Sequence, residues 1–247
     1  MAARVIKELK GFSGNQVFLM QKGQHIFVRK SGNVERNVER MYALADDYPL
    51  PKIYNYSKNK LDIEYISGYD INTYLRHNDP EPLLEFLIAI FEKMSADTVE
   101  YDYSTLYRQK TDSQILETLG LSTATLLKRL PSLLPQSVYH GDLTLENVIC
   151  SKNGSFYLID CQTTEYHSYV FDIAKLRQDL ECLWFVRNSQ QKHQIKLHYI
   201  QQQIFKRFPE SNNNAILILM LLRVYNYTIP ESFERNFIIK EIKRLWK

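Results

Sequence analysis

The sequence predicts an α+β protein with two parts, a small β-rich part at the N-terminus and a larger, mainly helical part after it. The first observation is a set of short runs of β-forming residues within residues 4–32, each closing on glycine. The second is a change after Gly68, where apolar residues recur at helical spacing. The third is one polar segment, 139–162, between the helical stretches. We expect residues 1–66 to form the first part and residues 67–247 the second.

The N-terminal part is expected to begin with three short strands. These cover residues 4–11, 16–23 and 25–32, with a tight turn at Gly23. A helix is expected over residues 33–48, because its apolar residues recur every three or four positions. Two more strands are expected within residues 49–68, which start after prolines and end in glycine.

The C-terminal part is expected to be helical apart from one hairpin. The helical stretches cover roughly residues 70–78, 80–96, 112–130, 171–186, 190–207, 213–227 and 231–246. Between the third and fourth of them lie two short apolar runs, 148–150 and 156–160, joined by the turn residues Asn153 and Gly154. This pattern predicts a β-hairpin that ends at Asp160.

Composition and charge exclude several classes of protein. The 247 residues are 45% apolar and 24% charged, as in ordinary soluble globular proteins. A net charge of +3 is too weak to indicate nucleic-acid binding, and the longest apolar run, 215–222, is too short to span a membrane. Three cysteines without metal-ligand spacing, and a charged N-terminus unlike a signal peptide, favour a reduced cytoplasmic protein. The oligomeric state is left open.

Three polar residues of the segment 139–162 form a candidate site. Asp142 and Asn147 lie in a predicted loop, and Asp160 ends a predicted strand. The hairpin would bring Asn147 and Asp160 to the same end, where a carboxylate and an amide oxygen suit Mg²⁺. Asp142 would then accept a proton, as transfer of a phosphoryl group to a hydroxyl requires. For any single aspartate, capping of a turn or helix is the favoured interpretation, but the joint spacing of the set favours the site.

The motif also carries a family resemblance. His140-Gly-Asp142-Leu-Thr-Leu-Glu-Asn147, followed by Leu-Ile-Asp160, resembles the signature of aminoglycoside phosphotransferases, choline kinases and related small-molecule kinases. The resemblance implies a bilobal protein-kinase-like fold with a small antiparallel N-lobe and a helical C-lobe. It further implies that Asp142 is the catalytic base and that Asn147 and Asp160 hold Mg²⁺. The co-substrate is expected to be ATP, with GTP open, and His140 is expected to hold the loop.

The resemblance extends to a glycine-bearing hairpin that would contact the nucleotide phosphates. The stretch 11-GFSGNQV-17 joins two predicted strands, and glycine lets backbone N–H groups approach a phosphate. The candidate residues in this hairpin are Gly11, Ser13, Gly14 and Asn15.

Further candidates lie on the third strand, the first helix and the connector. In the resembling enzymes a basic strand residue holds the phosphates and pairs with a helix glutamate. Arg29 and Lys30 compete for this role because they point to opposite faces of the sheet, and we prefer Arg29. Its expected helix partner is Glu39, with Glu35 as the alternative. Glu64 and Ile66 are expected at the hinge that contacts the adenine.

Departures from protein kinases predict a small acceptor. Gly141 replaces the arginine beside the catalytic aspartate, and Thr144 replaces a lysine. The interval from Asp160 to Asp172 is too short for an activation loop and a peptide platform. We expect the acceptor to be a hydroxyl of a sugar, a glycan precursor, an amino alcohol or an aminoglycoside. The alternatives are a kinase-like scaffold that binds nucleotide without turnover and, less favoured, a protein kinase.

Overall fold

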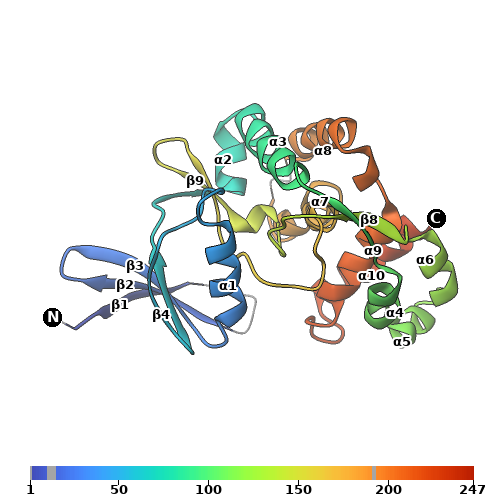
Figure 1. The fold of residues 1–247 in the computed structure, drawn as a ribbon, viewed down its shortest axis with the longest axis horizontal. Helices are drawn as coiled ribbons and strands as arrows, with labels where there is room; N and C mark the ends of the chain where they lie inside the picture. Colours follow the sequence, from blue (N-terminus) through green and yellow to red (C-terminus); the bar gives the residue numbers. More distant parts are fainter. Residues whose placement is uncertain (1, 10–14, 191–192) are drawn as a thin grey trace. The chain divides into compact units, whose positions relative to one another are not determined.

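The computed structural model describes residues 2–9, 15–190 and 193–247 (Figure 1). By its internal contacts the chain divides into two compact units. Unit 1 comprises residues 1–77 and 140–164, and unit 2 comprises residues 78–139 and 165–247. The N-terminal strands and the polar segment with Asp142, Asn147 and Asp160 therefore belong to the same unit. The expected lobe boundary between residues 66 and 67 stays a prediction.

Unit 1 is built on a five-stranded antiparallel sheet with the strand order β1-β2-β3-β5-β4. The strands are β1 (Arg4–Leu9), β2 (Gln16–Lys22), β3 (His25–Ser31), β4 (Ile53–Ser57) and β5 (Lys60–Glu64). Gly23 makes the turn between β2 and β3 with a φ of +62°, a conformation that favours glycine. The predicted antiparallel N-terminal sheet is confirmed.

Helix α1 (Glu35–Leu44) supplies the apolar face predicted from its spacing. The buried residues of this face are Val34, Val38, Met41 and Leu44. Met20, Phe27 and Leu61 of the sheet are buried as well, so strands and helix contribute to the core of unit 1. Burial of each such side chain stabilises the fold by roughly 1.5–3 kcal/mol.

A second, three-stranded sheet of unit 1 carries the polar segment. Its order is β10-β9-β6, and its strands are β6 (Gly68–Asp70), β9 (Val148–Ser151) and β10 (Phe156–Leu158). The 3₁₀-helix η1 (Leu145–Asn147) precedes β9, and α2 (Ile71–His77) follows β6. Gly68 is required because a Cβ there would lie 2.1 Å from the Cys150 carbonyl oxygen. The predicted hairpin between β9 and β10 is confirmed.

Unit 2 is mainly helical. Its helices are α3 (Glu81–Ser95), α4 (Ser104–Lys110), α5 (Ser113–Thr118), α6 (Thr123–Arg129), α7 (Tyr169–Leu180), α8 (Gln194–Arg207), α9 (Asn214–Tyr225) and α10 (Phe233–Trp246). Two 3₁₀-helices, η2 (Trp184–Val186) and η3 (Pro209–Ser211), connect some of them. Helix α7 packs against α8 and α9, and α9 packs against α10.

Two features of unit 2 correct the expectations. The single helix expected over residues 112–130 is wrong, because Gly120 adopts a φ of +73° and ends α5, and Ser122 then caps α6 by accepting from Thr125 N–H. The second is a two-stranded sheet that was not expected, in which β7 (Val99–Asp102) pairs with β8 (Leu133–Gln136).

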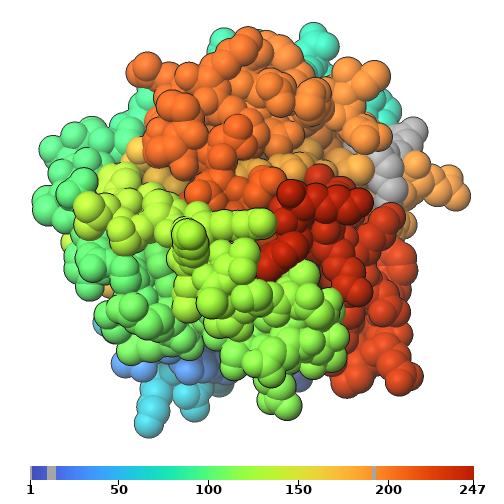
Figure 2. All heavy atoms as spheres, turned by 90° about the vertical axis from the view of Figure 1, so that its right-hand side faces the viewer, coloured from blue at the N-terminus to red at the C-terminus, as the bar shows by residue number. Residues whose placement is uncertain are grey.

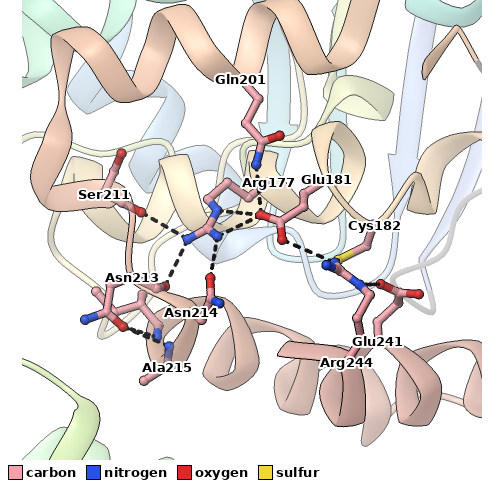
Figure 3. Close-up of polar contacts among 11 residues, drawn as sticks. Arg177, Glu181, Cys182, Gln201, Ser211, Asn213, Asn214, Ala215, Glu241 and Arg244 are labelled. Carbon is pink, nitrogen blue, oxygen red and sulfur yellow. Dashed lines mark hydrogen bonds and ion pairs between the residues drawn. The ribbon is translucent and has the colours of Figure 1, made fainter. Parts of the chain in front are cut away.

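A buried arginine holds the helices of unit 2 together (Figure 3). Every residue of α7 is buried, so its polar side chains need partners inside the protein. Arg177 makes five hydrogen bonds, the number of its N–H groups: two to the Glu181 carboxylate, one each to the backbone oxygens of Ser211 and Asn213, and one to the Asn214 side chain. The guanidinium therefore links α7 to the start of α9.

The carboxylate of Glu181 extends this network to two more helices. Its Oε2 atom also accepts from Gln201 of α8 at 2.8 Å, and its Oε1 atom accepts from Arg244 of α10 at 3.2 Å. Arg244 in turn donates to Glu241 at 2.6 Å. Both oxygens of the carboxylate are thus taken by protein donors (Figure 3).

The C-terminal helix lies beside α6 on one face of unit 2 (Figure 2). Arg129 Nη1 donates to the Trp246 carbonyl oxygen at 2.7 Å, and its guanidinium lies 5.1 Å from the centre of the Trp246 ring. This contact attaches the end of α10 to the end of α6.

The described helices are all too short or too polar to span a bilayer.

Candidate active site

His140 fastens the loop of the signature to the strand that leads to Asp160. Its ring is fully buried, and Nε2 lies 3.0 Å from the Ile159 carbonyl oxygen. The N–H of Asp142 donates to Nδ1 at 3.3 Å, so the ring is neutral and carries its proton on Nε2. Burial lowers the pKa of His140 to about 4, which keeps this form at neutral pH. The expected loop-holding role of His140 agrees with these contacts.

Gly141 allows the loop to approach the segment after Asp160. Its φ is +92°, and a Cβ would lie 2.1 Å from the Gln162 carbonyl oxygen. The N–H of Gln162 donates to the His140 carbonyl oxygen at 3.0 Å, so the two segments run side by side. An arginine at position 141, as in protein kinases, would not fit this contact.

Asn147 lies between the loop and the end of the hairpin. Its amide nitrogen donates to the Asp142 carbonyl oxygen at 2.8 Å. Its own carbonyl oxygen accepts from Ile159 N–H at 2.9 Å, which brings it next to Asp160 along the neighbouring strand. Within the described residues, the Asn147 amide oxygen makes no hydrogen bond, so this oxygen is the atom available to a cation.

Asp160 adopts an unusual backbone conformation at the end of the hairpin. Its φ is +58°, in the left-handed region that aspartate tolerates better than most residues. One carboxylate oxygen, Oδ1, accepts from Lys30 Nζ at 2.5 Å and from Asn37 Nδ2 at 3.1 Å. The other oxygen, Oδ2, has no hydrogen bond to the described part of the chain, and the side chain is 39% exposed.

The two basic residues of β3 have different partners. Arg29 makes two hydrogen bonds of 2.6 Å to the carboxylate of Asp62, which faces it on β5. Hydrogen bonding to Asp62 raises the pKa of Arg29. Lys30 points to the other face and reaches Asp160, with only 9% of its side chain exposed. Alternation along the strand separates the two side chains, as expected. The structure thus brings Lys30 to the site and keeps Arg29, the preferred residue, on Asp62.

Asn37 of α1 reaches the site. Besides its bond to Asp160, its amide nitrogen donates to the Cys161 carbonyl oxygen at 2.8 Å. Glu39 and Glu35 are exposed, and neither makes an ion pair with a described residue. The sequence analysis missed Asn37, although it is a polar residue on the apolar face of α1.

The expected phosphate-binding hairpin lies largely outside the described residues. This holds for Gly11, Ser13 and Gly14. Asn15 is described, and its side chain donates to the Asn33 carbonyl oxygen at 3.3 Å, just before α1. This bond ties the start of β2 to the start of the helix.

The expected hinge residues follow β5. Glu64 ends the strand, its N–H donates to the Lys52 carbonyl oxygen at 2.8 Å, and its carboxylate accepts from Lys52 N–H at 3.2 Å. Ile66 lies half-buried between β5 and β6. Both residues stay candidates for contact with a nucleotide base.

The donor atoms at the hairpin end fit a magnesium ion that keeps most of its ligands from water and phosphate. The available oxygens are Oδ2 of Asp160 and the amide oxygen of Asn147, and Mg²⁺ usually takes one or two protein ligands of this kind. Among the described residues, no group of three or more His, Cys, Asp or Glu side chains could hold a metal ion. Two protein oxygens with room for further ligands suit a hard cation bound together with a phosphate.

A lysine, an aspartate and an asparagine around a β-hairpin, beside a loop with a second aspartate, define a class of phosphotransferase with the kinase-like fold. The chain belongs to the phosphotransferase enzyme family, whose model matches residues 10–194, well over half of its length. This membership confirms the predicted enzyme class and the family resemblance. No curated protein matches the sequence.

Solved structures confirm the predicted α+β, protein-kinase-like fold. A thermostable mutant of aminoglycoside phosphotransferase APH(4)-Ia is similar with a TM-score of 0.68 and 12% identity, over 99% of this chain and 94% of that chain. Choline kinase LicA from Streptococcus pneumoniae is similar with a TM-score of 0.59 and 16% identity, over 100% and 93%. An ethanolamine kinase from Plasmodium vivax is similar with a TM-score of 0.57 and 13% identity, over 100% and 81%.

Proposed function

We propose that the protein is an ATP-dependent kinase that transfers the γ-phosphoryl group to a hydroxyl of a small molecule. The observation that carries the proposal is the convergence of Lys30, Asn147 and Asp160 around the end of one hairpin, next to the loop of Asp142. All four residues lie in unit 1. Family membership supports the phosphotransfer chemistry.

The proposed roles divide the acidic loop from the metal ligands. Asp142 orients the acceptor hydroxyl and accepts its proton, which is worth roughly 10²–10⁴ in rate. Oδ2 of Asp160 and the amide oxygen of Asn147 would hold Mg²⁺. When bound, the ion neutralises charge on the phosphates of the nucleotide. Neutral His140 and the Asn147 amide nitrogen keep the loop of Asp142 in place.

We assign the phosphate-binding role on β3 to Lys30 in place of Arg29. Lys30 already faces Asp160, and its ammonium group can reach phosphates held by a cation at the same carboxylate. Arg29 is held in a two-bond pair with Asp62 on the neighbouring strand, so its guanidinium is committed to the sheet. In this assignment Gly11, Ser13, Gly14 and Asn15 would cover the phosphates.

The acceptor and the nucleotide are proposed in broad classes. Structures similar in fold are described as ternary complexes of APH(4)-Ia variants with ADP or AMP-PNP and hygromycin B, and others as choline and ethanolamine kinases. These descriptions favour ATP and a sugar, aminoglycoside, amino alcohol or glycan precursor. Glu64 and Ile66 would contact the adenine. The location proposed is the cytoplasm, with no nucleic-acid partner.

Phosphoryl transfer from Mg·ATP to a panel of alcohols tests the proposal. The panel contains sugars, aminoglycosides, choline and ethanolamine, and product formation is followed by mass spectrometry. We expect at least one acceptor to be phosphorylated, with the rate in Asp142→Asn lower by roughly 10²–10⁴. The exposed Asp46→Asn is the matched control. Nucleotide binding without transfer to any alcohol would favour the scaffold alternative, and transfer to protein substrates would favour a protein kinase.

A further inference from the structure

Asn37 is a polar residue among the buried side chains of α1. It lies on the apolar face of the helix and is only 6% exposed. Its amide nitrogen makes two hydrogen bonds, to the side chain of Asp160 and to the backbone oxygen of Cys161. A buried amide on an apolar face is costly unless its hydrogen bonds are made, so this position is specialised for the segment it contacts.

The geometry of α1 excludes the two helix glutamates from this position. Successive residues turn by about 100° around a helix axis, so Glu39 and Glu35 each lie about 200° from Asn37. Both are exposed. At position 37 the helix therefore presents a neutral amide to Asp160, where a kinase that pairs its lysine with a helix glutamate would present a negative charge.

The neutral amide of Asn37 reduces the number of acidic partners that Lys30 has at the site. With a helix carboxylate, the ammonium group would have two acidic partners, but here its described ion-pair partner is Asp160 alone. Lys30 and Asn37 donate to the same oxygen, Oδ1. When Lys30 moves to a nucleotide phosphate, the bond from Asn37 can keep this oxygen in place and leave Oδ2 facing a metal ion.

The same helix also fixes the backbone after Asp160. Besides the bond from Asn37 to the Cys161 carbonyl oxygen, Thr163 N–H donates to the Arg36 carbonyl oxygen at 3.0 Å. Asp160 itself has a φ of +58°, a conformation that needs support from its surroundings. Asn37 thus contacts both the side chain of Asp160 and the residue after it.

We propose that Asn37 is the positioning residue of Asp160. It stands where related kinases would have a helix glutamate, but it orients the metal ligand Asp160, whereas the glutamate would hold the lysine. The proposal rests on the proposed function, since Asp160 must bind Mg²⁺ for its position to matter. Groups that hydrogen-bond a metal ligand orient it, and their removal typically weakens metal affinity by about 10- to 100-fold. A glutamate that held only the lysine would mainly affect phosphate binding.

The test measures ATP binding by calorimetry in two arms, one with EDTA and one with Mg²⁺ titrated at fixed ATP. For Asn37→Ala we expect the Mg²⁺ concentration for half-saturation to rise by about tenfold or more, while ATP affinity in EDTA stays close to that of the wild type. Asn37→Ser keeps one hydrogen-bond donor, so its Mg²⁺ concentration for half-saturation should lie between those of the wild type and Asn37→Ala. The matched control is Asn55→Ala, at an exposed position of β4, and thermal unfolding confirms that each variant is folded.

The possible outcomes distinguish failure of the inference about Asn37 from failure of the proposed function. The inference is overturned if Asn37→Ala behaves like Asn55→Ala, or if ATP affinity falls by the same factor in both arms, as loss of structure alone would cause. A variant series that is unfolded at Ala and normal at Ser would also assign Asn37 to stability. If the wild type fails to bind ATP in either arm, the proposed function itself is wrong.

Discussion

Two ion pairs, each with a buried basic member and one in each unit, show how similar chemistry serves different ends. In unit 2, Arg177 uses all of its N–H groups, and both oxygens of Glu181 are taken. In unit 1, Lys30 and Asn37 crowd onto one oxygen of Asp160 and leave the other without a described partner. We call the Arg177–Glu181 pair closed, because both carboxylate oxygens are bonded and the pair holds helices together. We call the Lys30–Asp160 pair open, because one carboxylate oxygen stays available. Between these two ion pairs, the carboxylate oxygen without a described partner is what distinguishes Asp160 from Glu181.

The largest expected effect is on the open pair. Asp160→Asn keeps the shape of the side chain and a residue type that tolerates the left-handed conformation, but it removes the charge that a metal ion needs. We expect phosphoryl transfer to fall by at least about 10³-fold, because charge neutralisation carries most of this reaction. The free energy of unfolding should change by less than about 1 kcal/mol, because the side chain is partly exposed. Transfer at a wild-type rate would contradict the assignment.

The closed pair should show the opposite balance. Arg177→Ala removes the main partner of the half-buried Glu181, and losing one member of such a pair costs roughly 3–5 kcal/mol. The exposed pair of Arg207 with Glu92 is the matched control, and Arg207→Ala should cost no more than about 1 kcal/mol. Denaturant unfolding measures both values. Equal costs would mean that the network of Figure 3 contributes nothing special.

The two basic residues of β3 sharpen the comparison within unit 1. Lys30→Ala should weaken ATP binding by roughly 10- to 150-fold, since one charge-assisted bond contributes roughly 1.5–3 kcal/mol. Arg29→Ala breaks the pair with Asp62 and should mainly lower stability, by about 1 kcal/mol, because the Arg29 side chain is 26% exposed. Calorimetry and denaturant unfolding on both variants check this. A larger loss of ATP affinity in Arg29→Ala would return the phosphate-binding role to Arg29.

The last comparison concerns the pH dependence of stability, to which the buried ring of His140 contributes. Because burial lowers the pKa of His140 to about 4, the unfolded chain takes up a proton between its ordinary pKa of about 6.5 and pH 4 while the folded ring does not. Above about pH 6.5 the ring is neutral in both states and costs no stability. As the pH falls below this value, the free energy of unfolding decreases, by about 2 kcal/mol at about pH 5. In His140→Asn the unfolding free energy should fall less over this range. Equal slopes would mean that the buried ring accepts a proton.

The motif and its hairpin could be predicted because they are local. The spacing from Asp142 to Asn147, and the two apolar runs around Gly154, lie within one short segment, so their geometry follows from the chain itself. The confirmed N-terminal sheet is of the same kind, since its first strands are joined by a short turn at Gly23.

The parts that could not be predicted depend on contacts between distant segments. Lys30, left open beside Arg29, and Asn37, which was not expected, meet Asp160 across intervals of 130 and 123 residues. The rotation of α1 decides which helix residues face inward. A polar residue at an apolar-face position was the available signal for Asn37. The pairing of β7 with β8 was missed for a related reason, because its strands are short and far apart in the sequence.

A crystal structure with Mn²⁺ and AMP-PNP tests the central claim most directly, because anomalous scattering locates the metal without assumptions. The account predicts a metal bound by Oδ2 of Asp160 and the amide oxygen of Asn147, with phosphate oxygens completing its shell. Lys30 should have left Asp160 for a phosphate, and Asn37 should still donate to Oδ1. A metal at other residues, or Lys30 still paired with Asp160 beside a bound nucleotide, would contradict the account.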